Sequence, residues 1–355
     1  MGMKRLLLLC AAILLLTGAL TGAFAEEGEN WDDFFRSAEG RISFTLPLAP
    51  DVIEEKDLLE EEARTSGMEY IGWRDKIQLL CSTQEGDLEI HIADLEPMLN
   101  QIRADHPDYS EENYQANALM NLAYVTTLVY DGSIVGQPEA KVLEVDGQYF
   151  PQLDYWCTFP DDPAVRYHGK GLMDGTRAVL ATAPENTTLS RFLEELRPMA
   201  EAEAAAFHGR EKETLRIGRM EITFPIAPDA AQGEDYEFYD VFTPDYAYIT
   251  LEYDPITVSN SLLPLMANIE VRNAAKSLGE SYVEKGKIVT YTMEQVSNGV
   301  WRVFGYVPLK DYLPEDSQRQ RMLSIYLTPE GAYLLETEET PAAQALLSSI
   351  VFPSP

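Results

Sequence analysis

The sequence has few basic side chains for its length. It contains 27 Lys and Arg against 59 Asp and Glu in 355 residues, so its formal net charge is −32. Basic side chains supply most of the non-specific affinity of proteins for nucleic acids and for anionic lipid headgroups. We therefore predict that neither nucleic acid nor an anionic membrane surface is a partner. The acidic excess favours solubility, and the alternatives are a basic partner or weakly bound divalent cations.

Familiar catalytic and cofactor motifs are also missing. The chain has no G-x-S-x-G, H-E-x-x-H, G-x-x-x-x-G-K-[ST] or G-x-G-x-x-G pattern and no D-x-D-x-D-G calcium loop. Its histidines lack a second histidine within one helical turn: His91, His106, His168 and His208. His91 alternates with Ile90 and Ile92, which predicts a half-exposed side chain on a strand, beside Glu89. We predict no catalytic residue, no cofactor and no metal site.

Neighbouring carboxylates and tryptophans are weak candidates for a site. The acidic pairs are Asp32-Asp33, Asp161-Asp162 and Glu234-Asp235. A hard cation needs six to eight converging oxygens, which a dipeptide does not supply, so we expect solvated loops. Trp73, Trp156 and Trp301 lie in strand-like surroundings. We expect them to pack in the core, and a sugar-stacking platform is the alternative.

Cysteine is scarce, with three residues in the chain. Cys10 belongs to an N-terminal apolar run, which leaves Cys81 and Cys157 to form one bridge in an oxidising compartment. Both lie in apolar, strand-like runs, where a free cysteine packs as a small hydrophobe. Their number and separation exclude a CxxC pair and a zinc knuckle. The sequence leaves a Cys81–Cys157 disulfide open.

The N-terminus has the three parts of a secretory signal peptide. Two basic residues in Met1–Arg5 precede the apolar run Leu6–Leu16, and Ala23-Phe24-Ala25 has the small-x-small pattern of a cleavage site. We predict a signal peptide over 1–25 and a secreted or extracytoplasmic protein without membrane insertion after cleavage. A lipid anchor on Cys10 and a retained N-terminal anchor are the alternatives.

An internal repeat is the most informative feature of the chain. Arg41–Asp51 (RISFTLPLAPD) recurs as Arg219–Asp229 (RMEITFPIAPD), with six identities in eleven positions. Each segment reads as a strand that ends at Pro47 or Pro225, because proline cannot donate to a sheet ladder. The repeat predicts two domains of the same fold.

Each copy continues through the same series of predicted elements. Strands are expected at 76–82 and 87–94 and again at 236–243 and 246–253, and helices from Ser110 and from Leu262. The helix from Ser110 is predicted to bury Tyr114, Ala118, Leu122 and Val125 at helical spacing. Two hairpins follow in each copy, the first across Asp146-Gly147 or Asn298-Gly299, with type I′ turns expected. Short helices close the copies after Thr187/Thr188 and after Thr340-Pro341.

This series predicts an α+β fold of two tandem domains, each an antiparallel β-sheet flanked by helices. The boundaries that we predict are a signal peptide at 1–25, an N-terminal segment at 26–39, a first α+β repeat at 40–198, a helical linker at 199–214 and a second α+β repeat at 215–355. The acidic insert Glu54–Glu62 is expected to be solvated.

The element series resembles the PsbP-like family, the fold of a photosystem extrinsic subunit and of exported bacterial relatives. The resemblance rests on an opening strand that ends in proline, a central helix, successive hairpins and the terminal helix Ala345–Phe352. It implies a non-enzymatic docking or assembly module and assigns no binding residue. The function predicted here is thus an exported, non-catalytic binding or assembly module acting on a protein or cell-envelope partner. The alternatives are an envelope hydrolase with a carboxylate site formed only in the fold, and a protein that binds a glycan or a small ligand.

Overall fold

The computed structural model describes residues 35–54, 73–129, 131–160, 162–232, 236–243, 247–311 and 318–353. The predicted signal peptide and the first part of the N-terminal segment lie outside these residues. So do Asp32-Asp33, most of the acidic insert, Asp161 and Glu234-Asp235. The chain divides into two compact units, which are described separately. The first contains Phe34–Arg210 and Asp311–Arg319, and the second contains Glu211–Lys310 and Gln320–Pro355.

The first unit begins with a hairpin and ends with a helix. Its elements are, in chain order, β1 (Phe35–Glu39), β2 (Ile42–Leu46), β3 (Asp51–Glu54), β4 (Arg74–Thr83), β5 (Gly86–Asp94), α3 (Glu96–Asp105), α4 (Glu111–Val129), β6 (Ser133–Ile134), β7 (Glu139–Val145), β8 (Gln148–Phe159), β9 (Asp162–Asp174), β10 (Arg177–Pro184), α5 (Ser190–Glu195), β11 (Arg197–Pro198) and α6 (Glu201–His208). Strand β1 starts before residue 40, so the first repeat includes the end of the predicted N-terminal segment. Helix α6 lies inside the predicted linker.

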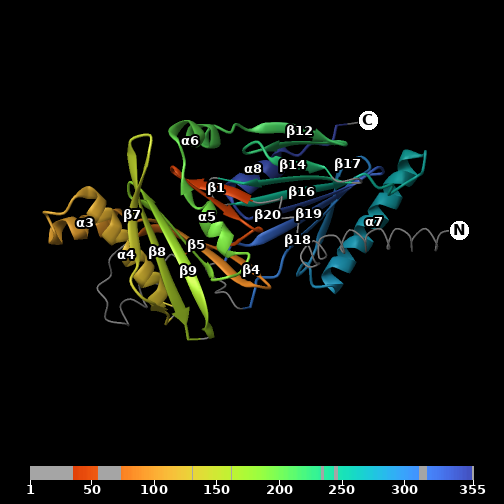
Figure 1. Ribbon diagram of the computed structural model, residues 1–355. Coiled ribbons are helices and arrows are strands. Elements are labelled where there is room, and N and C mark those ends of the chain that lie inside the picture. Colours follow the sequence, from red (N-terminus) through yellow and green to blue (C-terminus); the bar gives the residue numbers. More distant parts are fainter. Residues whose placement is uncertain are drawn as a thin grey trace. The chain divides into compact units, whose positions relative to one another are not determined.

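The second unit repeats this series with one helix fewer before the later strands. Its elements are β12 (Glu213–Ile217), β13 (Met220–Phe224), β14 (Asp229–Gln232), β15 (Glu237–Phe242), β16 (Tyr248–Asp254), α7 (Pro264–Glu284), β17 (Thr292–Ser297), β18 (Val300–Tyr306), β19 (Arg321–Leu327), β20 (Ala332–Glu338) and α8 (Pro341–Ser349). A single long helix, α7, therefore stands where the first unit has α3 and α4 (Figure 1).

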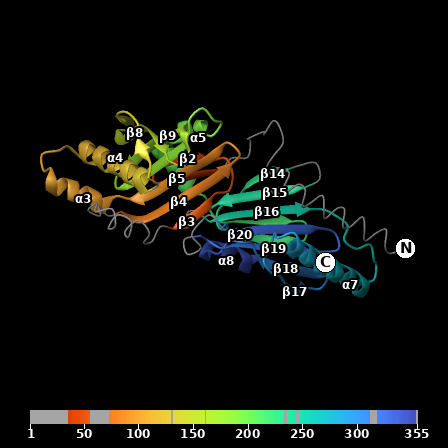
Figure 2. The same ribbon diagram turned by 90° about the horizontal axis from the view of Figure 1, so that it is seen from below.

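The two large sheets have the same strand order. The first runs β3-β4-β5-β10-β9-β8-β6, with β7 also paired to β8, and the second runs β14-β15-β16-β20-β19-β18-β17. All paired strands in both are antiparallel. Figure 2 labels neighbouring strands of each sheet, β3, β4 and β5 in the first and β14, β15 and β16 in the second. The predicted α+β fold of two tandem domains is confirmed.

The segments that carry the sequence repeat lie at the same place in each unit. Strands β2 and β13 are the second strands of the β1-β2 and β12-β13 hairpins, and they end one residue before Pro47 and Pro225. Gly40 and Gly218 begin the two hairpin turns, with φ of 56° and 55°. Glycine adopts this left-handed conformation without steric cost, which favours the same tight turn in both copies.

The predicted hairpins are present, but one turn differs from expectation. Asp146 and Gly147 both have positive φ, as a type I′ turn requires. In the second unit, Gly299 has positive φ and Asn298 does not, and the register of β17 against β18 shifts between Gln295 and Ser297. The type I′ prediction for Asn298-Gly299 is therefore wrong, because the extra residue in β17 changes the geometry needed to close the hairpin.

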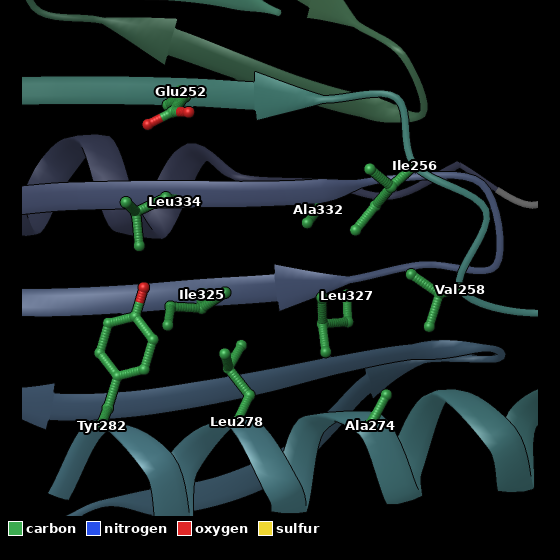
Figure 3. Close-up of a pocket in the computed structure, with 10 residues that line it drawn as sticks. All are labelled: Glu252, Ile256, Val258, Ala274, Leu278, Tyr282, Ile325, Leu327, Ala332 and Leu334. Carbon is green, nitrogen blue, oxygen red and sulfur yellow. The ribbon is translucent and has the colours of Figure 1, made fainter. Parts of the chain in front are cut away.

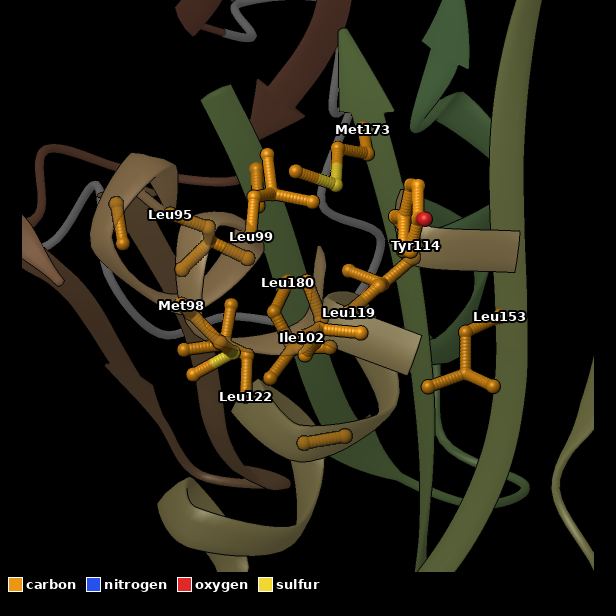
Figure 4. Close-up of a cluster of buried hydrophobic side chains, with 14 of the residues drawn as sticks. Leu95, Met98, Leu99, Ile102, Tyr114, Leu119, Leu122, Leu153, Met173 and Leu180 are labelled. Carbon is orange, nitrogen blue, oxygen red and sulfur yellow. The ribbon is translucent and has the colours of Figure 1, made fainter. Parts of the chain in front are cut away.

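The core of the first unit lies between its large sheet and α3 and α4 (Figure 4). Helix α4 buries Tyr114, Ala118 and Leu122, as predicted, but Val125 is only half-buried. Thr126 and Thr127 are buried instead. The hydroxyl of Thr127 donates to the carbonyl of Ala123 at 2.8 Å, which satisfies it within the helix and lets a polar side chain face the sheet.

The second unit has a core on each side of its large sheet. Helix α7 packs mainly on β17, β18 and β19, with Val271, Ala275 and Leu278 among its buried residues. The β12-β13 hairpin and α8 cover the other face. Thr340 caps α8, because its hydroxyl accepts from the backbone N–H of Ala343 at 3.3 Å, as predicted. The corresponding cap of α5 is not made.

Two threonines that were expected to begin α5 are engaged elsewhere. The hydroxyl of Thr187 donates to the carbonyl of Pro184, and that of Thr188 donates to the carboxylate of Glu85 at 2.8 Å. Leu189 occupies the N-cap position and provides no side-chain hydrogen bond. The backbone N–H of Thr188 donates to the same carboxylate at 2.7 Å, so Thr188 joins the start of α5 to the β4-β5 turn through charge-assisted hydrogen bonds.

Candidate functional site

The two cysteines of the first unit are free and buried. Cys81 lies in β4 and Cys157 in β8, with β5, β10 and β9 between them in the sheet. Four strand spacings amount to roughly 19 Å, whereas bonded cysteines need Cα atoms closer than about 7 Å. The disulfide that the sequence left open does not form in this fold.

Cys157 belongs to a buried polar cluster beneath α4. The hydroxyl of Tyr155 lies 3.0 Å from that of Thr182, and Thr127 faces the same group from α4. Burial raises the pKa of the Cys157 thiol to about 12. The sulfur is therefore held as a thiol at neutral pH, and a thiolate nucleophile is not available there.

The four histidines are separate from one another. The Nε2 atom of His91 lies 3.3 Å from a carboxylate oxygen of Glu89. His106 stacks on Tyr109, His168 stacks on Trp156, and His208 contacts the carbonyl of Gly40 at 2.7 Å. Among the described residues, no three His, Cys, Asp or Glu side chains gather as a metal site would require.

The prediction that His91 is half-exposed is wrong. Its side chain is fully buried, because it shares a face of β5 with Ala93, and α3 and α4 cover that face. Its cross-strand neighbour Leu180 belongs to the same core. The alternation with Ile90 and Ile92 placed His91 correctly on the opposite face of the strand, but it could not show that both faces are covered.

The tryptophans lie at the edges of the cores. Trp73 packs against the core of the first unit, beneath the ammonium group of Lys76, and Trp301 packs against the core next to α7. The indole N–H of Trp301 donates to Asn268 at 2.8 Å. This agrees with the expected packing role for both residues.

A pocket lies between α7 and the sheet of the second unit (Figure 3). It holds about 480 Å³ of space between atoms, including a part that is open to solvent. Its walls come from three strands, one helix and the segment that leads into the helix. The lining residues are Glu252, Ile256, Val258, Ala274, Leu278, Tyr282, Ile325, Leu327, Ala332 and Leu334.

The pocket has one polar end and one apolar end. Figure 3 shows Glu252 and Tyr282 at one end, on opposite walls, and Ile256 and Val258 at the other. Burial raises the pKa of Glu252, and the neighbouring carboxylate of Asp254 raises it further. Burial also raises the pKa of Tyr282 to about 12. Glu252 is half-buried and Tyr282 is buried, and the rest of the pocket is apolar.

The segment before α7 holds the apolar end in place. The backbone N–H groups of Val258 and Ser259 donate to the carbonyl of Pro329 at 2.9 and 3.1 Å. The hydroxyl of Ser259 donates to the carboxylate of Glu270 on α7 at 2.7 Å. These bonds fix the segment against both the β19-β20 turn and the helix, so Ile256 and Val258 form a wall of the pocket.

An exposed apolar surface lies on the opposite side of the same helix. Leu262 is 98% exposed, Leu263 66% and Leu265 71%, and Met266 and Ile269 are also exposed. We call these five residues the α7 stripe. Ala267, Val271 and Ala274 point the other way into the core, so Leu265, Met266 and Ile269 lie on the outer face of α7. Single exposed leucines are ordinary in proteins, but five exposed apolar side chains within residues 262–269 make this segment a candidate interaction surface.

Neither feature was identified from the sequence. A helix from Leu262 was predicted, and its apolar residues at 271, 274, 275 and 278 could have shown its buried face. Leu265, Met266 and Ile269 fall outside that face, and this was the available signal for the α7 stripe. The pocket had no such signal, because Glu252 and Tyr282 are 30 residues apart in the chain.

The lining of the pocket offers few chemically reactive groups. Among the described lining residues, Glu252 is the one carboxylate, and no serine, cysteine or histidine lines the pocket. Hydrolysis of a glycoside by paired carboxylates requires two such groups flanking the substrate. The pocket therefore lacks the pair that the hydrolase alternative requires.

Comparisons with known proteins provide no assignment. No family model matches the chain, and no curated protein matches it. The di-domain ARO/CYC StfQ from the steffimycin biosynthetic pathway is 10% identical, with 61% of this chain and 76% of that chain covered and a TM-score of 0.13. The apo immunity protein TplEi of the T6SS from Pseudomonas aeruginosa is 10% identical, with 92% and 99% covered and a TM-score of 0.10. Scores this low carry no argument about fold or function.

No helix of the described chain combines the length and the apolar character that crossing a membrane would require.

Proposed function

We propose that this protein is an exported, non-catalytic binding or assembly module that docks to a protein partner through the α7 stripe. The observation that carries the proposal is the exposure of five apolar side chains at the start of one helix. Burying a leucine that is otherwise exposed contributes about 1.5–3 kcal/mol. A partner that covers the stripe would thus gain several such contributions.

The stripe supports a particular mode of recognition. Apolar residues on one face of a helix dock into a hydrophobic groove of a partner, and the spacing of the anchors fixes their register. Leu265, Met266 and Ile269 have this arrangement on α7. The net charge of −32 adds a long-range preference for a partner whose groove has a basic rim. An anionic membrane surface is disfavoured by the same charge.

A paired capture experiment tests the proposal. The protein is immobilised and exposed to envelope extract of its source cell, and retained polypeptides are identified by mass spectrometry. We expect one polypeptide that wild type and Leu128→Ser both retain and that Leu265→Ser with Ile269→Ser loses. Leu128 is the matched control, because it is an exposed leucine on α4 of the first unit. Direct titration with that purified polypeptide should show the same difference.

Two outcomes would contradict the proposal. Equal retention by wild type and the Leu265→Ser, Ile269→Ser variant would show that the stripe is not the docking surface. Turnover of an envelope polymer by the purified protein, abolished by one carboxylate-to-amide change, would show that the protein is an enzyme. The resemblance to the PsbP-like family agrees with a docking role and remains a prediction.

A further inference from the structure

We propose that this protein associates with a second copy of itself, and that the α7 stripe of one copy enters the pocket between α7 and the sheet (the α7 pocket) of the other. In this contact the stripe takes the place that α3 has in the first unit. The inference goes beyond docking to a separate partner, and it rests on the proposed function only in treating the stripe as an interaction surface. Two comparisons between the units carry it.

The α7 stripe repeats the sequence pattern of α3. Residues 95–102 read LEPMLNQI, and residues 262–269 read LLPLMANI. The leucine, proline and isoleucine at the first, third and eighth positions are identical, and the fourth and fifth positions hold Met-Leu in one segment and Leu-Met in the other. In both segments the proline lies in the first turn of a helix. The shared apolar positions, i, i+3, i+4 and i+7, form one face of that helix.

This face is buried in the first unit and exposed in the second. In α3 its four side chains are at most 7% exposed: Leu95, Met98, Leu99 and Ile102. In the α7 stripe the four counterparts are at least 42% exposed: Leu262, Leu265, Met266 and Ile269. Removing such side chains from water is favourable wherever an apolar site receives them. The first unit supplies that site in its own core, and the second unit leaves the same pattern in solvent.

The α7 pocket is the counterpart of the site that holds α3. The β9-β10 hairpin corresponds to the β19-β20 hairpin, because the two large sheets have the same strand order. Three residues of the first hairpin pack in one core with α3 (Figure 4): Met173, its cross-strand neighbour Ala178, and Leu180. The residues at the same positions of the second hairpin line the pocket (Figure 3): Leu327, its cross-strand neighbour Ala332, and Leu334.

The register of each hairpin fixes this correspondence. The turn of the first hairpin is closed by Asp174 opposite Arg177. The turn of the second is closed by Thr328, whose backbone N–H donates to the carbonyl of Gly331 at 2.9 Å. The pair that packs with α3 and the pair that lines the pocket each follow next. The long helix forms another wall in both units, since α4 contacts α3 and α7 lines the pocket.

A single chain cannot bring its own stripe into its own pocket. Leu265 and Ile269 lie in the same continuous helix as Ala274 and Leu278, which line the pocket, and they lie on the opposite side of that helix. A second copy has no such restriction. Exchange of an equivalent element between copies is a low-cost route to association, because the packing already exists within one chain. Here the first unit provides the example of that packing.

Charge opposes this contact and gives it a recognisable salt dependence. Each copy has a formal net charge of −32, so two copies repel each other. Added salt screens this repulsion, since the Debye length is about 8 Å at physiological ionic strength and shortens above it. Self-association should therefore strengthen as salt is added. Docking to a partner with a basic rim should weaken under the same change.

Sedimentation velocity of the exported protein tests the proposal. Wild type should form species larger than the monomer as its concentration rises, and more of them at high salt. Leu265→Ser with Ile269→Ser removes two anchors of the stripe and should weaken association by about 100-fold or more, as the loss of two buried apolar side chains implies. Leu128→Ser is the matched control, because Leu128 is an exposed leucine on α4, and it should associate as wild type does.

A mixture of two variants tests the pairing of stripe with pocket. Ala274→Leu adds volume to the pocket and leaves the stripe intact, so it should associate about 10-fold or more weakly than wild type. The Leu265→Ser, Ile269→Ser variant keeps the pocket and lacks the stripe. Neither should associate alone at concentrations where wild type does. Mixed, with a fluorescent label on one of them, they should form a one-to-one complex, because each supplies the half that the other lacks.

Three results would overturn the proposal: wild type that stays monomeric at every concentration and salt level, a stripe variant that associates as wild type does, or a mixture that forms no complex. The first uses wild type alone and does not depend on the folding of any variant. Monomeric wild type with stripe-dependent capture of another polypeptide would refute self-association and leave the docking function standing. Self-association with equal capture by wild type and the stripe variant would do the reverse.

Discussion

The two units share a strand order, but they fill the helix side of their sheets differently. In the first unit, α3 stands between β5 and the long helix, and Leu95, Met98, Leu99 and Ile102 complete a close-packed core. In the second unit, a short irregular segment takes the place of α3 in the chain, and Ile256 and Val258 from it line a pocket. The same topology thus yields a closed core in one copy and an apolar pocket in the other.

The largest loss of stability is expected from a cavity in the core of the first unit. Leu99→Ala removes a fully buried side chain of α3 and should lower the free energy of unfolding by about 2–5 kcal/mol. Val258→Ala, at the half-buried edge of the pocket, should lower it by about 1 kcal/mol. Urea unfolding followed by circular dichroism measures both changes. Equal losses at the two positions would show that the units are packed alike.

Enlarging a side chain should change the free energy of unfolding in opposite directions in the two units. Ala118→Leu adds volume to the filled core beneath α4 and should destabilise the protein by about 1–3 kcal/mol. Ala274→Leu adds the same volume to the pocket beneath α7 and should stabilise it by about 0.5–2 kcal/mol. The same unfolding measurement applies, and destabilisation by Ala274→Leu would mean that the hollow does not accept added carbon atoms.

The smallest effect concerns two half-buried carboxylates with opposite pKa shifts. In the first unit, burial opposes ionisation of Asp154, but His168, the hydrogen bond from Gln152 and the charge of Lys141 outweigh it and lower the pKa. In the second unit, burial and then Asp254 raise the pKa of Glu252, and Tyr282 is the other titratable group nearby. Ionisation of Asp154 should therefore stabilise the native state, whereas ionisation of Glu252 should destabilise it.

Unfolding curves of Asp154→Asn and Glu252→Gln, measured across a range of pH, test these two effects of ionisation. At neutral pH, Asp154→Asn should be less stable than wild type, and the difference should shrink as pH falls through the lowered pKa of Asp154. Glu252→Gln should be more stable than wild type at neutral pH. Its advantage should disappear as pH falls through the raised pKa of Glu252 and below the ordinary glutamate value. Parallel pH profiles for the two variants would contradict the contrast.

Local sequence signals predicted most of the elements of both units. The Asp146-Gly147 turn, the Pro47 and Pro225 strand ends and the Thr340-Pro341 helix start were correctly placed, because each depends on the backbone preferences of adjacent residues. Where a local preference competed with a tertiary contact, the prediction was wrong. Thr188 binds Glu85 instead of capping α5, and His91 is covered on a face that alternation alone marks as open.

The candidate site was beyond the same reasoning. A pocket forms where neighbouring residues leave space unfilled. The sequence of Pro255–Leu263 does not indicate that this segment, unlike α3, leaves such a space beneath the long helix. The stripe was within reach, because Leu265, Met266 and Ile269 lie off the face that carries Val271 and Ala275. Its exposure still required a fold that leaves the outer side of α7 uncovered.

The sequence by itself indicated the duplication, most of the strands and helices along each copy and the acidic charge, since these follow from identities, periodicity and composition, but α3 was not among the predicted elements. Only the tertiary structure decided which faces of the sheets and helices are covered by other elements and which are exposed to solvent. It brought Glu252 and Tyr282 to one end of a pocket, although they are 30 residues apart, and set Cys81 and Cys157 too far apart to bond. Whether two distant residues lie near each other depends on the order of the strands in the sheet, and the sequence around each residue does not indicate that order.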